Sequence, residues 1–189
     1  MNQDDRRKYL IEGLLKERPE YENMQIPSDA GKQKILLRSL MNIRMPKKMD
    51  YAFLQIQDAY LSEENEKKGI VTLADIREAQ PDLYIWKGDI TRLRVGAIVN
   101  AANSGMTGCY QPCHNCIDNC IHTYAGIQLR NYCNNMMIEQ GQEEPTGQAK
   151  IMNKYLHMEL GKAMSLSGMC VALSAALVYD KKTVVLIYE

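Results

Sequence analysis

The chain has 189 residues, and its 23 Lys and Arg residues balance 23 Asp and Glu residues, so the formal net charge is zero. Proteins that bind duplex nucleic acid usually carry a basic excess. Charge therefore gives no support for a nucleic-acid or membrane-surface partner. The length suffices for one domain and an appendage.

Cysteine usage and the first residues indicate the compartment. Residues 1–7 are polar and charged, without the apolar stretch of a secretory signal. All six cysteines follow residue 108. We therefore expect a reducing, cytoplasmic environment with thiols free for metal binding or catalysis. The uncharged run 163–179 is at the short limit for a membrane span and contains serines and a glycine, so we expect no membrane helix.

Three helices are predicted in the first seventy or so residues. The first ends before Pro19, the second is capped by Ser28 or Asp29, and the third runs from a cap at Asp50 to Gly69. Their apolar faces are Tyr9, Leu10, Leu14 and Leu15; Ile35, Leu36, Leu40 and Ile43; and Phe53, Leu54, Tyr60 and Leu61. These helices carry no evident chemistry, which predicts a helical extension (residues 1–75) packed on a main domain (residues 76–189).

Strands and helices alternate after Ile70. Residues 83–86 and 95–99 are predicted strands, and the nearly continuous apolar content of the second suits a strand covered on both faces. Residues 117–140 are predicted as one long helix. Its inner face is formed by Ile117, Ile121, Leu129, Cys133 and Met136. The alternation indicates a layered α/β fold.

Polar residues follow both predicted strands, where ligands bind in open α/β sheets. Asp89 offers an acceptor for a ligand amino group, and Asn100 and Asn103 offer amide groups suited to sugar hydroxyls. The alternative is that residues 103–105 are simply a turn, and spacing alone favours the turn.

The cysteines that follow allow three interpretations. Residues 109, 113, 116 and 120 share one face of a continuous helix and could pack in a core, but Pro112 would interrupt that helix. Four cysteines could form a closed metal site, although Cys120 lies inside the predicted long helix. In the third interpretation Cys109, His114 and Cys116 are three ligands of an open, catalytic-type zinc site. Spacing favours the open site and leaves the other two possible.

Several segments resemble macrodomain motifs: residues 86–91 (WKGDIT), 97–104 (AIVNAANS), 116–119 (CIDN), 121–122 (IH), 125–126 (AG), 129–130 (LR) and 145–151 (PTGQAKI). The Cys/His insert resembles the zinc-containing subfamily, the bacterial and fungal protein-ADP-ribose hydrolases. Residues 43–46 (IRMP) and 54–58 (LQIQD) resemble the helical part of the same subfamily. The resemblance covers about residues 8–151, and its specific part is the insert.

This resemblance implies a three-layer α/β/α macrodomain with a mixed central sheet, preceded by the helical extension. It implies that Asp89 and the Ile90 backbone contact adenine, that Asn103 holds the distal ribose, and that Ile117 and Asp118 line the phosphate and distal-ribose end. Zinc would be bound by Cys109, His114 and Cys116, with Cys116 also lining the pocket, whereas Cys113 and Cys120 are not ligands.

The function implied is zinc-dependent removal of ADP-ribose from mono-ADP-ribosylated proteins, with Asn103 and Asp118 as the catalytic residues. Asp118 is the candidate acid/base or water-orienting group. A non-catalytic ADP-ribose binding module and an inactive fragment of such a hydrolase are the alternatives.

The resemblance stops after Ile151, because residues 152–189 lack the later family segments, including a loop that wraps the diphosphate. For this tail we expect a helix over residues 162–179 and a strand from residue 183. We also expect a truncated gene product, with a shifted reading frame after Lys150 as one cause and a shortened, divergent domain as the alternative.

Overall fold

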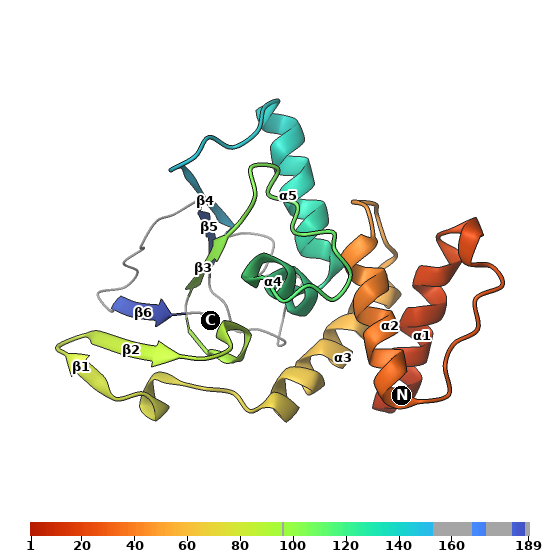
Figure 1. Ribbon diagram of the computed structural model, residues 1–189, viewed down its shortest axis with the longest axis horizontal. Helices are drawn as coiled ribbons and strands as arrows, with labels where there is room; N and C mark the ends of the chain where they lie inside the picture. Colours follow the sequence, from red (N-terminus) through yellow and green to blue (C-terminus); the bar gives the residue numbers. More distant parts are fainter. Residues whose placement is uncertain (96, 153–167, 173–182, 188–189) are drawn as a thin grey trace.

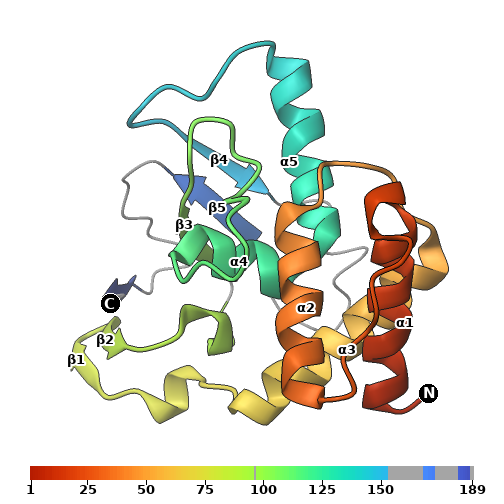
Figure 2. The same cartoon turned by 45° about the vertical axis from the view of Figure 1, so that its right-hand side comes forward.

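The computed structural model describes residues 1–95, 97–152, 168–172 and 183–187. In this part of the chain, three N-terminal helices lie on one side of the molecule and the strands lie on the other (Figure 1 and Figure 2). Helix α4 lies between the two and contacts both α2 and strand β3. No helix within the described ranges is long and apolar enough to cross a membrane.

The three predicted N-terminal helices are confirmed as α1 (Gln3–Lys16), α2 (Ala30–Ile43) and α3 (Tyr51–Lys68). Of the two candidate caps of α2, Asp29 is the one used, since its carboxylate accepts the N–H of Lys32 at 2.8 Å. Asp50 caps α3 in the same way through Phe53. Such caps satisfy backbone donors that the first helical turn leaves unpaired.

The buried face of α2 differs from the predicted one. Leu37 and Met41 are buried, whereas Ile35 is 62% exposed. The face includes Gln33, which is 3% exposed and accepts a hydrogen bond from Arg7 Nε at 2.9 Å. Of the predicted face, Leu40 is buried and Leu36 is partly buried against the same core, so the prediction is wrong at Ile35. Buried polar residues such as Gln33 complete the stripe, which apolar periodicity alone does not reveal.

Residues 117–140 form two helices instead of the predicted single one. Helix α4 (Ile117–Ala125) ends at Gly126, and α5 (Ile127–Gln140) begins directly after it. Gly126 has φ 86°, and a Cβ at this position would collide with the side chain of Gln57 from α3. Gln57 also accepts the N–H of Ile127 at 3.0 Å, so the break between α4 and α5 lies where α3 contacts them.

The described strands are β1 (Glu78–Gln80), β2 (Leu83–Lys87), β3 (Ala97–Ala101), β4 (Ala149–Met152), β5 (Gly168–Ala172) and β6 (Thr183–Ile187). They form two three-stranded sheets with the orders β1-β2-β6 and β3-β5-β4. In each sheet one pair is parallel and the other antiparallel.

The predicted strands at residues 83–86 and from residue 183 are confirmed, and the one at 95–99 begins two residues later. The helix expected over residues 162–179 is wrong where β5 lies, because that segment pairs with β3 and β4. The rest of that helix, and most of the tail on which the truncation hypothesis rests, lie outside the described residues.

Two groups of buried apolar residues stabilise the fold. One joins α1, α2 and α3 around Leu10, Leu37 and Phe53 and also includes Ile127 of α5. The other lies beneath the strands, and the predicted inner face of residues 117–140 supplies Ile121, Leu129 and Cys133 to it. Fully burying one such Leu or Ile side chain contributes about 2 kcal/mol. The first cluster therefore joins α5 to the N-terminal helices, and the second holds α4 and α5 against the strands.

Candidate active site

A loop of fifteen residues, 102–116, joins β3 to α4 and carries most of the candidate site. We call it the Cys/His loop. Its backbone has positive φ at Met106 (56°), Gly108 (84°) and Cys113 (53°). A Cβ on Gly108 would lie 2.7 Å from the ring of His122, so only glycine fits between this ring and the loop.

The three predicted metal ligands converge on this loop. The ligand atoms of Cys109, His114 and Cys116 all lie within 4.8 Å of one another, and Cys109 Sγ is 3.7 Å from His114 Nδ1. Two sulfurs and one imidazole nitrogen are a donor set that suits zinc and related soft cations. The group could therefore hold a metal ion with a further coordination position open to a ligand.

Cys113 lies apart from this group. Its Sγ is 3.2 Å from Ser39 Oγ and 3.6 Å from the Ile35 carbonyl oxygen, so the thiol lies against α2. Cys120 lies inside α4, and its Sγ is 3.7 Å from Arg38 Nη2. Of the three interpretations of the cysteines, the geometry favours the three-ligand group.

Cys116 is both a ligand candidate and the N-cap of α4, where its Sγ accepts the N–H of Asn119 at 3.4 Å. Burial raises the pKa of the Cys116 thiol, and the neighbouring Cys109 thiol adds to this effect. A divalent cation at the group would reverse the balance, because metal coordination deprotonates a thiol.

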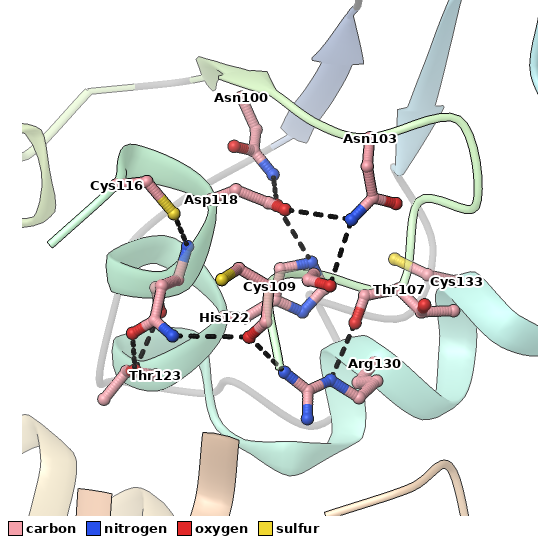
Figure 3. A network of polar contacts seen from close by, with 12 residues as sticks. Asn100, Asn103, Thr107, Cys109, Cys116, Asp118, His122, Thr123, Arg130 and Cys133 are labelled. Carbon is pink, nitrogen blue, oxygen red and sulfur yellow. Dashed lines mark hydrogen bonds and ion pairs between the residues drawn. The ribbon is translucent and has the colours of Figure 1, made fainter. Parts of the chain in front are cut away.

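A buried polar network surrounds Asp118, which is 5% exposed (Figure 3). Its Oδ1 accepts Asn100 Nδ2 at 2.8 Å, and Asn103 Nδ2 lies 3.5 Å from Oδ2. Asn103 also donates to the Gly108 carbonyl at 3.0 Å, and His122 Nε2 is 3.6 Å from Asp118 Oδ1. The network thus brings the two predicted catalytic residues, Asn103 and Asp118, together.

Burial shifts both titratable groups of this network toward their neutral forms. It raises the pKa of Asp118, and the Asn100 hydrogen bond and the charge of Arg130 offset this only in part. Burial also lowers the pKa of His122 to about 3, with Arg130 acting in the same direction. A neutral imidazole therefore lies beside Asp118. The sequence offered no sign that His122 would lie beside Asp118, apart from its place in a family motif.

Asp89 lies at a second position, after β2. Its carboxylate accepts the N–H and the hydroxyl of Thr91 at 3.0 and 2.6 Å and lies 3.4 Å from Lys68 Nζ. Burial acts to raise the pKa of Asp89, but the Thr91 hydrogen bonds and the Lys68 charge outweigh it, so the pKa is lowered. Ile90 is 5% exposed and belongs to the apolar cluster beneath the strands.

One cavity of about 670 Å³ is lined by Asp89 and by one residue of the Cys/His loop, Asn115. Asp89 lines it on one side, and Asn115, between two of the ligand candidates, lines it on another, together with Arg38, Lys68 and Tyr124. The Asp89 turn and Asn115 thus share a cavity, whereas Asn103, Cys116 and Asp118 are not among its lining residues. Ile117 instead packs against the core beneath the strands.

The candidate site lies where β3 ends and the Cys/His loop leads into α4. This position is typical of ligand sites in α/β proteins. Residues 99–157 match the family model of the Macro domain. The resemblance to the macrodomain family is therefore confirmed over residues 99–157.

The chain is also similar to two bacterial proteins named protein-ADP-ribose hydrolase. It is 60% identical over 155 residues to the one from Treponema medium, covering 80% of this chain and 59% of the relative. It is 40% identical over 151 residues to the one from Staphylococcus aureus strain MRSA252, covering 79% of this chain and 56% of the relative. The chain thus spans less than two thirds of the length of these curated relatives.

Among solved structures, the chain is similar to a Trypanosoma brucei macrodomain, with a TM-score of 0.46 and 19% identity over 74% of this chain and 57% of that one. The same macrodomain in complex with ADP-ribose also matches with a TM-score of 0.46 and 19% identity, over 74% of this chain and 59% of that one.

Proposed function

We propose that this chain is a zinc-dependent hydrolase that removes ADP-ribose from mono-ADP-ribosylated proteins. The observation that carries the proposal is the convergence of Cys109, His114 and Cys116 within 4.8 Å, directly before the buried Asp118. The names of the Treponema medium and Staphylococcus aureus relatives support the same activity.

In this proposal Asp89 accepts a hydrogen bond from the adenine amino group, with the Ile90 backbone beside it. The lowered pKa of Asp89 supports this role, because an ionised carboxylate is the stronger acceptor. Asn103 holds the distal ribose at the other end of the ligand. Cys116, Ile117 and Asp118 line the phosphate and distal-ribose end.

The zinc ion would be held by Cys109, His114 and Cys116. When bound, it supplies a Lewis acid that orients a ribose hydroxyl or polarises water. Asp118 accepts a proton from the attacking water at a carboxylate oxygen as the water oxygen bonds to the ribose and the bond between ribose and protein breaks. The departing side chain then takes up this proton, which returns Asp118 to its ionised form. Asn100 orients that carboxylate through its 2.8 Å hydrogen bond, and Asn103 fixes the sugar against it.

The finer architecture belongs to the same proposal. We propose a three-layer α/β/α macrodomain with a mixed central sheet over residues 76–189, preceded by a helical extension over residues 1–75. The mixed pairing in both described sheets and the separate apolar cluster of α1–α3 support this division. The partners proposed are ADP-ribose and an ADP-ribosylated protein in the cytoplasm, with no nucleic acid and no membrane.

The test combines metal analysis with hydrolysis of an ADP-ribosylated protein. The wild-type chain is expected to contain one zinc per molecule, and His114→Ala is expected to lose zinc and hydrolysis together. Cys113→Ala is the matched control, because the Cys113 thiol lies on the same loop but points to Ser39. It should keep both properties.

Full turnover by zinc-free His114→Ala protein would rule out the zinc mechanism. A calorimetric titration with ADP-ribose separates the remaining alternatives. Binding without hydrolysis in the wild type, retained in Asp118→Ala, would identify a non-catalytic binding module. Neither binding nor cooperative unfolding would identify an inactive fragment.

A further inference from the structure

The backbone of the Cys/His loop is held by side chains that lie outside the ligand group. Arg130 of α5 donates to the carbonyl oxygens of Thr107 at 2.7 Å and Cys109 at 3.3 Å. Asn119 of α4 donates to those of Cys109 at 3.3 Å and Gln111 at 2.9 Å. These contacts fix the first half of the loop from the helices that follow it in the chain.

The second half of the loop is held from α2, in the N-terminal helical extension. The N–H of Cys113 donates to Asn42 Oδ1 at 2.9 Å. Asn42 is 1% exposed, and its Nδ2 donates to Thr123 Oγ1 of α4 at 2.9 Å. One buried amide thus ties α2, the loop and α4 together at a residue that lies between two ligands.

Arg38, one turn earlier on α2, holds the ligand residue itself. Its Nη2 donates to the His114 carbonyl at 2.7 Å and to Asn119 Oδ1 at 3.2 Å. All of these contacts are made by Nη2, whereas the buried Nε of Arg38 has no hydrogen-bond partner among the described residues.

This loop needs to be held, because its backbone is strained. Cys113 and Met106 have positive φ without being glycine, at 53° and 56°. A non-glycine residue in this region is strained and persists only where its surroundings impose the conformation. Cys113 lies one residue before His114, so releasing the contact to Asn42 lets this segment relax and moves the imidazole away from the two thiols.

We infer that α2 is part of the metal centre: Asn42 and Arg38 are positioning residues that hold the Cys/His loop in the conformation in which its three ligand atoms converge. The inference rests on the proposed zinc function, since it concerns how tightly the same group binds its ion. It assigns a role in metal binding to helices that carry no ligand themselves.

The test measures zinc affinity by competition with a chromophoric chelator in the full chain. Asn42→Ala and Arg38→Met are each expected to weaken zinc binding by roughly 10–100-fold, the usual loss when a residue that orients metal ligands is removed. The absorption spectrum of the Co²⁺-substituted protein is a second readout. Its thiolate charge-transfer and d–d bands should change in both variants, because the ligand geometry changes.

Two controls separate positioning from general stability. Gln57 is as buried as Asn42, at 1% exposed, and joins α3 to α5 without touching the loop. Lys34 lies one turn before Arg38 on α2 and pairs with Glu64. Gln57→Ala and Lys34→Met should therefore keep wild-type zinc affinity and the wild-type Co²⁺ spectrum, even where the free energy of unfolding falls.

Each outcome decides a different point. Wild-type zinc affinity and spectra in Asn42→Ala and Arg38→Met would overturn the positioning role while leaving the metal site intact. A wild-type chain without stoichiometric zinc would overturn the metal site and this inference together. If Asn42→Ala does not fold, Arg38→Met alone tests the positioning role, because the Arg38 side chain is only partly buried.

Discussion

The Cys/His loop and the Asp89 turn each follow a β-strand, yet different kinds of contact hold them. The loop is fixed by side chains from α2, α4 and α5, some more than 70 residues away in the chain. Asp89 is held by Thr91, two residues on, and by Lys68 at the end of α3. The conformation of the Cys/His loop therefore depends on tertiary packing, whereas the conformation of the Asp89 turn is set largely by nearby residues.

This contrast predicts that changes near the loop alter folding and metal binding together, while changes at the Asp89 turn alter ligand binding alone. The following experiments test that separation, beginning with the largest expected effect.

Arg130→Met is expected to lower the free energy of unfolding most. Arg130 is 5% exposed and donates to five backbone carbonyls, those of Thr107, Cys109, Met41, Asn42 and Arg44. Leaving several buried acceptors unpaired should cost about 3–5 kcal/mol. Urea unfolding measures this loss. Arg92→Met is the control, since Arg92 Nε donates to the Gly69 carbonyl, away from the loop, and it should cost about 1 kcal/mol.

His122 should make stability depend on pH. Its pKa is lowered from 6.5 to about 3 in the folded chain, so between these values the unfolded state binds a proton that the folded state does not. Stability therefore falls as pH drops below 6.5, by roughly 1 kcal/mol per pH unit.

The measurement compares urea unfolding of wild type and His122→Gln from pH 7 to pH 4, with a chelator present. Asp118 and Arg130 face His122 and are common to both proteins, and the raised pKa of Asp118 acts in the opposite direction in both. The variant should show the weaker loss toward acid. Equal slopes would mean that His122 takes up a proton in the folded protein.

Gly108→Ala should destabilise the chain and weaken zinc binding together. The backbone of Gly108 has a φ of 84°, which is unfavourable for alanine, and an added Cβ would lie 2.7 Å from the His122 ring. The expected cost is about 2–3 kcal/mol. Gly141→Ala is the control for the cost of the backbone conformation alone, because Gly141 has φ 74° and an added Cβ would have nothing within 4 Å. This substitution should lower the free energy of unfolding by about 1 kcal/mol without changing zinc affinity.

Asp89→Asn should have the smallest effect and should leave zinc affinity unchanged. Loss of the ionised acceptor is expected to weaken ADP-ribose binding about tenfold, equivalent to about 1.4 kcal/mol, in a calorimetric titration. Asp75→Asn is the matched control, since Asp75 also accepts the N–H and hydroxyl of a threonine, Thr72, but lies outside the cavity. A change in zinc affinity in Asp89→Asn would contradict the independence of the two ends.

Features set by neighbouring residues could be predicted from the sequence. The caps Asp29 and Asp50 act within three residues. Helix α1 ends before Pro19, and α3 runs from its cap at Asp50 to Gly69, as the capping and proline signals predicted. The Cys/His group is also local, because its ligands span eight residues of one loop. Spacing alone still left three interpretations of the cysteines, since a ligand set is defined by how the loop folds.

Features set by distant residues could not be predicted. The break at Gly126 exists because Gln57 of α3 occupies the space of a Cβ. The buried face of α2 turns away from Ile35 because Gln33 pairs with Arg7 of α1. The contact of Asn42 with Cys113 joins residues 71 positions apart. Apolar periodicity carries no information on such pairings. An Asn or Arg in a helix is therefore expected to face solvent unless its partner is known.

The anchoring of the loop by α2 also limits how this metal group can be transplanted. Grafting residues 107–116 into another α/β scaffold would carry over every ligand but neither Asn42 nor Arg38. The grafted segment would then have to reach its strained Cys113 backbone without the buried amide that accepts the Cys113 N–H at 2.9 Å. A designer would need to move α2 with the loop, so the smallest portable unit combines a helix and a loop that are distant in sequence.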